Sequence, residues 1–325
     1  MVNPIHTESQ LEDLLSQPSE ADVEAISRLQ GDLLVLGAGG KMGPSLVRRA
    51  RRAADLAGKE MQVMAPARST ADLTDRAQVD GLPDAANVIF MAGRKFGSTG
   101  NEPLTWAVNA WAPALVANRF RGSRIVAFST GNVYPFTAVE SGGATEETAT
   151  APVGEYAQSA LARERMFEYF SNTHGTRVAI LRLNYAIDLR YGVLLDIGSK
   201  VFERRPIDLT MGHVNVIWQG DANSICLRSL AHAASPALVL NVTGPETLAV
   251  RGIAAAFGAF FRVEPWFTGE ESATALLSNA TQCWRMFGPP RITVDEMILM
   301  TAQWIGVGGR TIGKPTHFEQ RDGAF

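Results

Sequence analysis

One stretch near the N-terminus limits the possible folds more than any other part of the chain. Residues 31–68 read GDLLVLGAGGKMGPSLVRRARRAADLAGKEMQVMAPAR, an apolar run, a glycine-rich turn, a stretch of helical character and a second apolar run. This order is typical of a βαβ unit, in which a helix joins two parallel strands. Because LLVL is apolar at every position, the first strand is predicted to be buried on both faces.

Similar apolar runs recur and indicate the fold class. NVIFMAG, SRIVAFST, RVAILRLN and PALVLNVTG are mostly separated by stretches of helical character. Strands that alternate with helices predict an α/β fold, a doubly wound parallel sheet (Rossmann-like) with a small C-terminal α/β substrate-binding region. The expected parts are a helical extension over 1–30, a dinucleotide-binding domain over 31–184 with return strands from 213–247, and a substrate-binding region with the tail over 185–212 and 248–325.

Composition excludes several classes of protein. Of 325 residues, 46% are apolar and 19% charged, as in ordinary globular proteins, and the net charge of −3 gives no basis for nucleic-acid binding. The two cysteines lack metal-type spacing, and no apolar run approaches the roughly 20 residues of a membrane span. The polar, acidic first residues do not resemble a signal peptide. We expect a cytoplasmic protein without a metal or a membrane partner.

The glycine-rich turn is the clearest candidate binding site. Gly37, Gly40 and Gly43 fit G-x-x-G-x-x-G, directly after an apolar strand and before a helix. Glycine allows the tight turn, the close approach of backbone to a pyrophosphate and tight helix packing, while the helix N-terminus attracts the phosphates. A ligand-free glycine turn is the alternative. The predicted cofactor-binding residues of this loop are Gly37, Gly39, Gly40, Lys41, Met42 and Gly43.

The residues after the second apolar run bear on the choice of dinucleotide. An acid usually binds the adenosine ribose of NAD here, whereas this chain has Ala67 and Arg68. Arg68, with Lys41 in the glycine loop, suits the 2′-phosphate of NADP, although both could be plain surface charges. NAD and NADP therefore both stay open, with a lean toward NADP.

Six further stretches occur in a fixed order along the chain. They are IFMAG, WAVNAWAPALVA, AFSTGNVYP, TEETATAPVGEYAQSALARE, VNVIWQGDAN and ALLSNATQCWRMFGPPRITVDEMILMTAQWI. Together with the glycine loop they resemble the extended short-chain dehydrogenase/reductase superfamily, specifically the NAD-dependent epimerase/dehydratase family, from about Asp32 to Trp304. The resemblance implies a homodimer formed through the helices that begin at Glu102 and Gly154.

The resemblance also assigns roles to single residues. Thr130 and Tyr156 correspond to the catalytic hydroxyl pair, in which a phenol exchanges a proton while hydride moves to the nicotinamide. Near the cofactor the resemblance implies Asp72, Leu73, Ala92, Gly93, Asn109 and Ser129. Near the substrate it implies Arg94, Lys95, Asn132 and Asn184. The expected function is that of an NAD(P)-dependent epimerase/dehydratase or oxidoreductase acting on a sugar-like or sugar-acid substrate.

One departure from the family weakens this expectation. Four residues after Tyr156 the family has a lysine, and this chain has Ala160. An ammonium about 4 Å away stabilises a phenolate by roughly 4 kcal/mol at an effective dielectric of 20. Arg163 begins roughly 10 Å along the helix, too far for direct contact, so Arg94 and Lys95 are the better candidate replacements. The alternative is a non-catalytic dinucleotide-binding sensor or assembly protein on the same fold.

Two other departures concern chain length. Residues 69–86 are too few for the helix, strand and helix that the family usually has there, so the sheet is expected to lack one strand or to contain a very short one. The segment after LRLN lacks the usual glycine-proline turn, which puts a nucleotide-sugar substrate in doubt. The tail GKPTHFEQRDGAF extends past the family's usual end, either over a site or a partner, or as an ordered surface segment.

Overall fold

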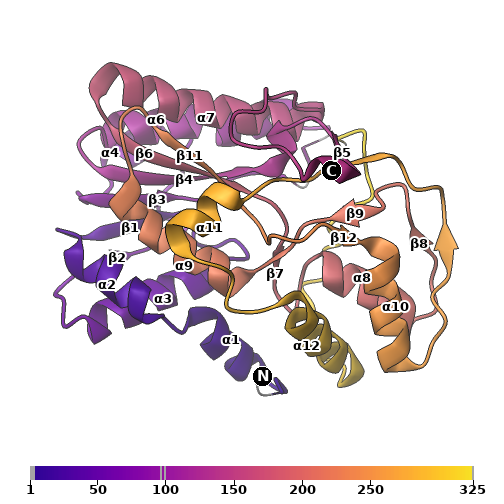
Figure 1. Ribbon diagram of the computed structural model, residues 1–325. Helices are drawn as coiled ribbons and strands as arrows, with labels where there is room; N and C mark the ends of the chain where they lie inside the picture. Colours follow the sequence, from indigo (N-terminus) through magenta and orange to yellow (C-terminus); the bar gives the residue numbers. More distant parts are fainter. Residues whose placement is uncertain (1–3, 96, 99, 324–325) are drawn as a thin grey trace.

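A six-stranded parallel sheet forms the centre of the protein. The computed structural model describes residues 4–95, 97–98 and 100–323. The strand order is β11-β6-β4-β3-β1-β2, and every neighbouring pair is parallel (Figure 1). The strands are β1 (Leu33–Leu36), β2 (Val63–Met64), β3 (Asn87–Phe90), β4 (Arg124–Thr130), β6 (Arg177–Leu183) and β11 (Leu238–Val242). The predicted α/β fold class with a doubly wound parallel sheet is confirmed.

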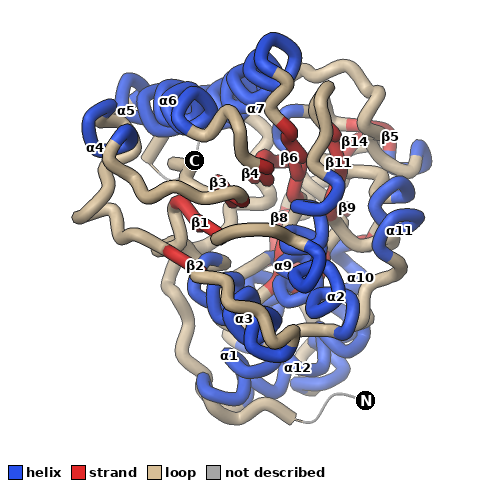
Figure 2. Tube along the Cα trace, turned by 90° about the vertical axis from the view of Figure 1, so that its left-hand side faces the viewer, coloured by secondary structure: helices blue, strands red, loops and turns tan. Residues whose placement is uncertain are grey.

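Strand β1 shows why the sheet is covered on both faces. Leu33 and Val35 belong to one apolar cluster, together with side chains of α3 (Gly43–Leu56) and α9 (Gln219–Ser229). Leu34 and Leu36 belong to another, with side chains of α6 (Ala112–Arg119) and α7 (Gly154–His174). Successive strand side chains point to opposite faces, so the uninterrupted LLVL run fills both layers. Figure 2 shows the helices on the two sides of the sheet.

The expected shortening of the sheet is also seen. Residues 65–86 contain the short helix α4 (Arg76–Asp80) and no strand, so β2 stands at the edge beside β1. Since β2 leads almost directly into the turns at 67–75, those turns lie against the carboxyl end of β1 instead of farther along a wider sheet.

The N-terminal extension forms the two expected helices, α1 (Glu8–Ser16) and α2 (Glu20–Arg28), each with a capping box. A buried ion pair attaches it to the sheet layer. The carboxylate of Asp22 accepts from the Arg49 guanidinium of α3 at 2.6 Å and from the Ser224 hydroxyl of α9. A buried charge is tolerated only when it is paired and hydrogen-bonded, so this cluster fixes how α2 packs.

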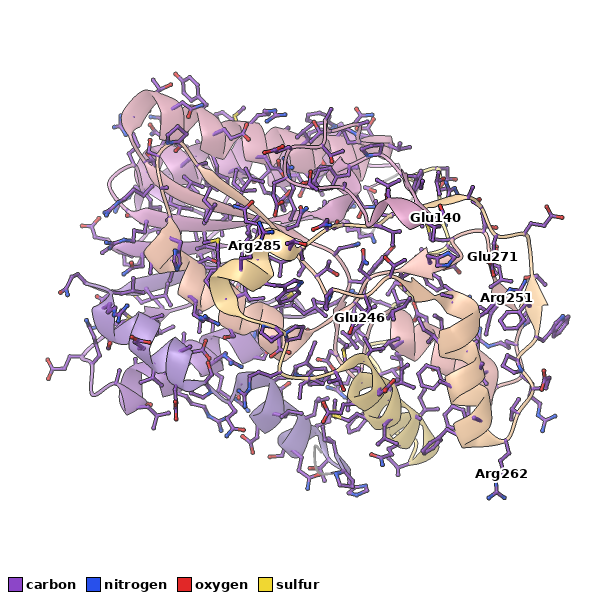
Figure 3. The ribbon with its side chains drawn as sticks, viewed as in Figure 1. Glu140, Glu246, Arg251, Arg262, Glu271 and Arg285 are labelled. Atoms are coloured by element: carbon purple, nitrogen blue, oxygen red, sulfur yellow. The ribbon has the colours of Figure 1, made fainter. Side chains whose placement is uncertain are left out.

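A second apolar core lies beyond the carboxyl ends of the strands. It contains side chains of α8 (Val193–Phe202), α10 (Val250–Phe261) and α12 (Val294–Gly306), together with Leu11 and Leu15 of α1. Four two-stranded ribbons surround it: β5 (Thr137–Ala138) with β14 (Thr274–Ala275), β7 (Ala186–Ile187) with β10 (Ile217–Trp218), β8 (Ile207–Asp208) with β13 (Phe267–Thr268), and β9 (His213–Val214) with β12 (Leu248–Ala249). In Figure 3, Arg251 of α10 lies beside Glu271, with which it forms a 2.6 Å ion pair, whereas Arg262 points outward.

The remaining elements are short. They are helices α5 (Glu102–Trp106) and α11 (Thr281–Phe287), the π-helical turn η1 (Ala107–Trp111), and the 3₁₀ turns η2 (Gly131–Val133), η3 (Val139–Ser141) and η4 (Leu230–His232). No helix of the described residues is long and apolar enough to cross a bilayer.

The C-terminal tail is a packed part of the second core. Thr316 donates from its amide and its hydroxyl to Asp196 of α8, at 2.7 and 2.6 Å. Phe318 is 2% exposed and belongs to the apolar cluster of α8 and α10. Arg321 then donates to the Thr274 carbonyl at 2.8 Å. The described part of the tail therefore runs from α12 along α8 toward β5, as Figure 1 shows.

Candidate active site

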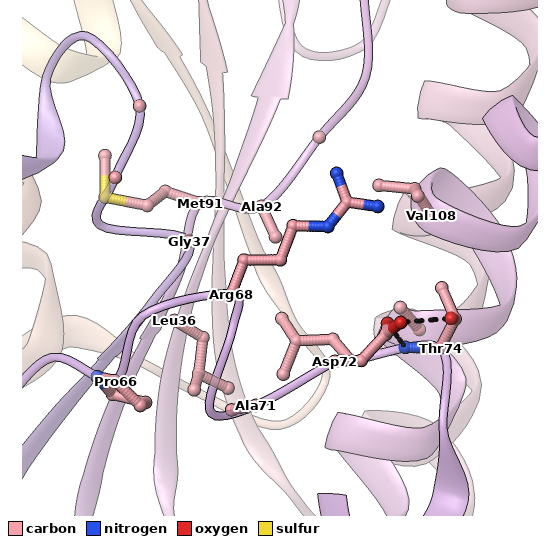
Figure 4. A pocket seen from close by; sticks show the side chains of 15 residues that line it. Leu36, Gly37, Pro66, Arg68, Ala71, Asp72, Thr74, Met91, Ala92 and Val108 are labelled. Carbon is pink, nitrogen blue, oxygen red and sulfur yellow. Dashed lines mark hydrogen bonds between the residues drawn. The ribbon is translucent and has the colours of Figure 1, made fainter. Parts of the chain in front are cut away.

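A cavity of about 310 Å³ opens at the carboxyl ends of β1, β2 and β3. Parallel sheets bind ligands at this edge, because the loops between strands and helices meet there. Figure 4 shows the cavity. It is lined by eight of the residues expected at the cofactor, namely Gly37, Gly39, Gly40, Arg68, Asp72, Leu73, Ala92 and Gly93, with Leu36, Pro66, Ala71, Thr74, Met91, Val108 and Ala112.

The glycines of the loop have two different roles, close packing of the backbone and exposure of the backbone to a ligand. Gly37 has a φ of +85°, and a Cβ on it would lie 2.4 Å from the Ala92 amide nitrogen, while one on Gly43 would lie 2.0 Å from the Ala38 carbonyl oxygen. These two glycines let the loop pack against β3 and α3. A Cβ on Gly39 would meet nothing within 4 Å, so this side of the loop is open to a ligand. Met42, which precedes α3, packs against the core.

The shape and chemistry of this cavity fit a dinucleotide. The loop backbone is exposed at Gly39 and Gly40, and the N-terminus of the 14-residue helix α3 follows it directly. Amide groups and a positive helix end suit a pyrophosphate, and the apolar walls suit the adenosine.

The adenosine end carries Arg68 and Asp72. Asp72 accepts from the Thr74 amide and hydroxyl at 2.9 and 2.8 Å, and these bonds lower the pKa of its carboxyl. Asp72 is the one acid among the lining residues, and its oxygen already holds the turn together. The exposed Arg68 side chain extends across the cavity in Figure 4. The charge of Arg68 also contributes to lowering the pKa of Asp72, so this carboxylate partly offsets the attraction of the guanidinium for an additional phosphate.

The predicted catalytic pair lies on two neighbouring elements. Thr130 ends β4, where its hydroxyl donates to the Asn132 side-chain oxygen at 2.9 Å and accepts from the Asn132 amide. Tyr156 is in the first turn of α7 and is half-buried. Ser129, expected at the cofactor, instead donates its hydroxyl to Glu164 of α7, which also forms a buried 2.6 Å ion pair with Arg182.

Ala160 stands where the family has its lysine, and it is fully buried. It packs with Val133, Tyr134 and Ala144. Lys95, one of the two expected replacements, lies with its Nζ 5.7 Å from the centroid of the Tyr156 ring. The other, Arg94, donates instead to the Gly97 carbonyl at 2.7 Å.

Arg163 is a site residue that the sequence did not indicate. Its guanidinium is buried and donates to the Phe128 carbonyl and to the Asn109 side-chain oxygen, both at 2.8 Å. A Cβ on Gly93 would lie 2.7 Å from one of its nitrogens. Burial lowers the pKa of Arg163, and the neighbouring charge of Tyr156 acts in the opposite direction. The side chain thus reaches back along α7 to lie beneath the cofactor-side loop.

Asn109 connects this loop to α7. It lies in the π-helical turn η1, and such turns re-aim side chains at functional sites. Its oxygen accepts from the Arg94 amide at 2.8 Å, and its nitrogen donates to the Arg94 carbonyl and to the Ser159 hydroxyl, both at 2.9 Å. Because both backbone groups of Arg94 are held, the adjacent Lys95 is positioned relative to α7.

Lys41 and Lys95 share one electrostatic environment. The Lys41 Nζ lies 2.9 Å from the centroid of the Tyr191 ring. Burial, followed by the charges of Lys95 and Lys314, lowers the pKa of Lys41 to about 7, while Asp196 opposes the shift. Burial lowers the pKa of Lys95 to about 8. Lys41, expected near the adenosine phosphate, thus points toward the second core.

Two predicted substrate residues lie near Leu276, which follows β14. Asn184 is buried and donates to the Leu276 carbonyl at 3.3 Å. Asn132 lines a small pocket together with the tail residues Gln320, Arg321 and Gly323. The tail therefore forms part of the wall of the pocket beside Asn132.

The fold and the cavity define a dinucleotide-binding α/β protein. Residues 33–187 match the family model described as the NAD dependent epimerase/dehydratase family. The match covers just under half of the chain, and it confirms the family resemblance predicted from the sequence and the NAD(P)-dependent enzyme class that this resemblance implies.

Several solved structures share the fold of this chain. RMD from Pseudomonas aeruginosa, complexed with NADPH, is 19% identical with a TM-score of 0.71, covering 85% of this chain and 99% of that one. MoeE5 in complex with UDP-glucose and NAD is 18% identical with a TM-score of 0.67, over 86% and 99%. UDP-glucose 4-epimerase from Thermotoga maritima is 14% identical with a TM-score of 0.67, over 85% and 98%. No curated protein matches the chain significantly.

Proposed function

We propose that this protein is an NAD(P)-dependent epimerase/dehydratase or oxidoreductase that acts on a sugar-like or sugar-acid substrate through Thr130 and Tyr156. One observation carries the proposal. The cavity lined by eight expected cofactor residues lies at the same sheet edge as Thr130 and as Tyr156, which has the Lys95 ammonium 5.7 Å from its ring centroid. Solved structures with this fold in complex with NAD, NADPH and UDP-glucose support the proposed cofactor and substrate classes.

The roles of the residues follow from their positions. The bound nicotinamide accepts and returns hydride. The Tyr156 phenol exchanges a proton with a substrate hydroxyl, and the Thr130 hydroxyl orients that group. Lys95 takes the role of the lysine that Ala160 replaces, because its Nζ lies 5.7 Å from the centroid of the Tyr156 ring. Arg163 adds a permanent positive charge beneath the loop that contains Gly93. Asn109 holds the same loop, which carries Lys95.

A non-catalytic dinucleotide-binding sensor or assembly protein is the second candidate. The observation in its favour is the tail, which lines the pocket beside Asn132 with Arg321 and Gly323. On this hypothesis the protein keeps a cavity for the dinucleotide, but the tail occupies the space that a substrate would need.

Dinucleotide titration followed by a substrate screen tests the proposal. NADH and NADPH are titrated by fluorescence, and sugar acids and nucleotide sugars are then screened with the preferred cofactor. We expect micromolar binding of at least one dinucleotide, with a preference for NADPH that Arg68→Ala reduces by about tenfold, equivalent to one lost charge-assisted hydrogen bond. If the dissociation constants of both dinucleotides are millimolar or higher, the proposal that the protein is an NAD(P)-dependent enzyme is wrong. Binding without turnover of any sugar favours the sensor.

A homodimer is the proposed assembly. Trp111 of η1 and Tyr169 of α7 are 50% and 54% exposed, on the two helical segments that the family resemblance implicates. Exposed aromatic side chains on adjacent helices are typical of an interface. Light scattering that shows a strict monomer contradicts the dimer.

A further inference from the structure

One helical segment connects two loops of the dinucleotide cavity. It runs through α5, η1 and α6, and its residue Val108 lines the cavity. Asn109 of this segment holds the loop after β3, because it bonds both backbone groups of Arg94, at 2.8 and 2.9 Å. Trp111, in the same π-helical turn, reaches the adenosine end, where its indole Nε1 donates to the Thr74 carbonyl at 3.1 Å. The segment therefore holds the cavity wall at two separate places.

The turn that Trp111 reaches carries the acid of the cavity. Asp72 accepts from the Thr74 amide and hydroxyl at 2.9 and 2.8 Å, as the dashed lines in Figure 4 show. The Asp72 amide donates to the Gln78 side-chain oxygen at 2.8 Å. Asp72, Leu73 and Thr74 all line the cavity. A shift of the Thr74 carbonyl would therefore move several groups that face the ligand.

The shortened sheet explains why this turn gains from a support on the helix. Among the described residues, β2 is the last strand on this side of the sheet, and no strand pairs with the backbone of the turn. Ala71 and Leu73 anchor the turn in an apolar cluster, but such contacts do not fix the direction of a carbonyl group. An indole can do so at a low cost in entropy, because it is rigid, has only two side-chain torsions and donates one hydrogen bond.

We propose that Trp111 is a positioning residue for the adenosine half of a bound dinucleotide. Its N–H fixes the Thr74 carbonyl, and the two bonds from Thr74 then fix the carboxylate of Asp72 in the cavity wall. Trp111 does not itself line the cavity, and its side chain is 50% exposed, so it acts through the turn and not by contact with the ligand. This inference rests on the proposed function, because the ligand is the cofactor of the same site.

Calorimetric titration with ADP-ribose tests this role, since the probe contains the adenosine and the pyrophosphate but no nicotinamide. Trp111→Phe keeps an aromatic ring and removes only the donor. It should weaken ADP-ribose binding about fivefold, equivalent to the loss of one neutral hydrogen bond. The melting temperature should equal that of the wild type, because the lost bond is exposed to solvent. Unchanged affinity for ADP-ribose overturns the proposal.

Trp106→Phe is the matched control. Trp106 lies on the same helical segment and is 38% exposed, but its Nε1 donates to the Glu155 carboxylate of α7 at 2.5 Å and not to the turn. The same substitution at this position should leave the affinity for ADP-ribose unchanged. An equal loss in both variants overturns the proposal, because it would assign the effect to the helical segment as a whole.

A double-mutant cycle with Asp72→Ala shows whether Trp111 acts through the turn. If it does, Trp111→Phe should add less than about twofold to the loss of affinity caused by Asp72→Ala, since the bonds between Asp72 and Thr74 are already absent. Additive losses of binding free energy would mean that Trp111 acts by another route, and they overturn the proposal.

Nuclear magnetic resonance of the wild-type protein with isotope-labelled indoles tests the same contact without a variant. Addition of ADP-ribose should shift the Trp111 Nε1–H signal, because its acceptor belongs to a turn that lines the cavity, and should leave the Trp106 signal in place. A Trp111 signal that does not move contradicts the proposal even if neither variant folds. Dinucleotide binding by the wild type, with unchanged ADP-ribose affinity in Trp111→Phe, refutes the positioning role alone, whereas absent dinucleotide binding refutes the proposed function.

Discussion

The two halves of the sheet's carboxyl edge are built in opposite ways. The adenosine half is an open cavity walled by glycines and small apolar side chains. The half that is predicted to be catalytic is filled with long polar side chains from separate segments, among them Lys41, Lys95, Tyr191 and Arg163. We therefore expect backbone groups to bind the ligand in the first half and side chains to bind it in the second. The first half can therefore stay close to a family pattern while the second diverges.

Removal of the Tyr156 hydroxyl should give the largest difference between an effect on turnover and an effect on dinucleotide binding. Tyr156→Phe is expected to lower kcat at least 100-fold, because the proton-transferring group is lost. The dissociation constant of NADH should change less than twofold, since Tyr156 does not line the adenosine cavity. Steady-state kinetics and fluorescence titration measure the two quantities. An equal loss in both would mean that the halves do not act separately.

Arg163 should be the most costly charged residue to replace. Arg163→Met leaves the Phe128 carbonyl and the Asn109 oxygen each without a donor that now lies at 2.8 Å. We expect about 3 kcal/mol lower free energy of unfolding, from urea denaturation. Arg165→Met is the control, since Arg165 is half-exposed and pairs with Glu168 on the surface; it should change stability by less than about 0.5 kcal/mol.

Arg163 should also position the catalytic side. Arg163→Met removes one hydrogen bond of Asn109, which holds both backbone groups of Arg94, so we expect Lys95 to lose part of its alignment with Tyr156. The pH profile of kcat should shift to higher pH, with partial recovery in Arg163→Lys. A stability loss with an unchanged pH profile would leave Arg163 a packing residue only.

The same contrast explains what the sequence could predict. The βαβ unit, the cavity glycines and the shortened sheet follow from local patterns: apolar runs, glycine spacing and the number of residues between Ser69 and Ala86. Arg163 was judged by the rise along the helix axis, yet helical side chains point toward the helix N-terminus, and a long one spans a further turn. The direction of Lys41 depends on Tyr191 and Lys314, which are distant in sequence. Local patterns hold no information about such partners.

A single methyl group should distinguish the two kinds of glycine in the open half. Gly37→Ala brings a Cβ to 2.4 Å from the Ala92 nitrogen at a φ of +85°, which we expect to cost about 2 kcal/mol of stability and to weaken dinucleotide binding about tenfold. Gly39→Ala meets no atom within 4 Å, so its melting temperature should equal that of the wild type. Equal destabilisation by both variants would contradict the division between packing and ligand-facing glycines.

The charge of Lys95, in the half that is predicted to be catalytic, should affect how the free energy of unfolding depends on pH. Lys95 has a pKa of about 8 in the folded protein, against an ordinary value of 10.5. Between these values the unfolded chain binds more protons, so the contribution of Lys95 to stability rises with pH across this window and is constant below it. Lys95→Met removes the buried charge. The variant should be about 1 kcal/mol more stable than the wild type at pH 7, after allowance for solvent screening, and should lose this advantage by pH 10.5. Urea denaturation at both pH values measures the difference. A constant offset would mean that Lys95 stays fully charged and solvated, so that the catalytic half is open like the adenosine half.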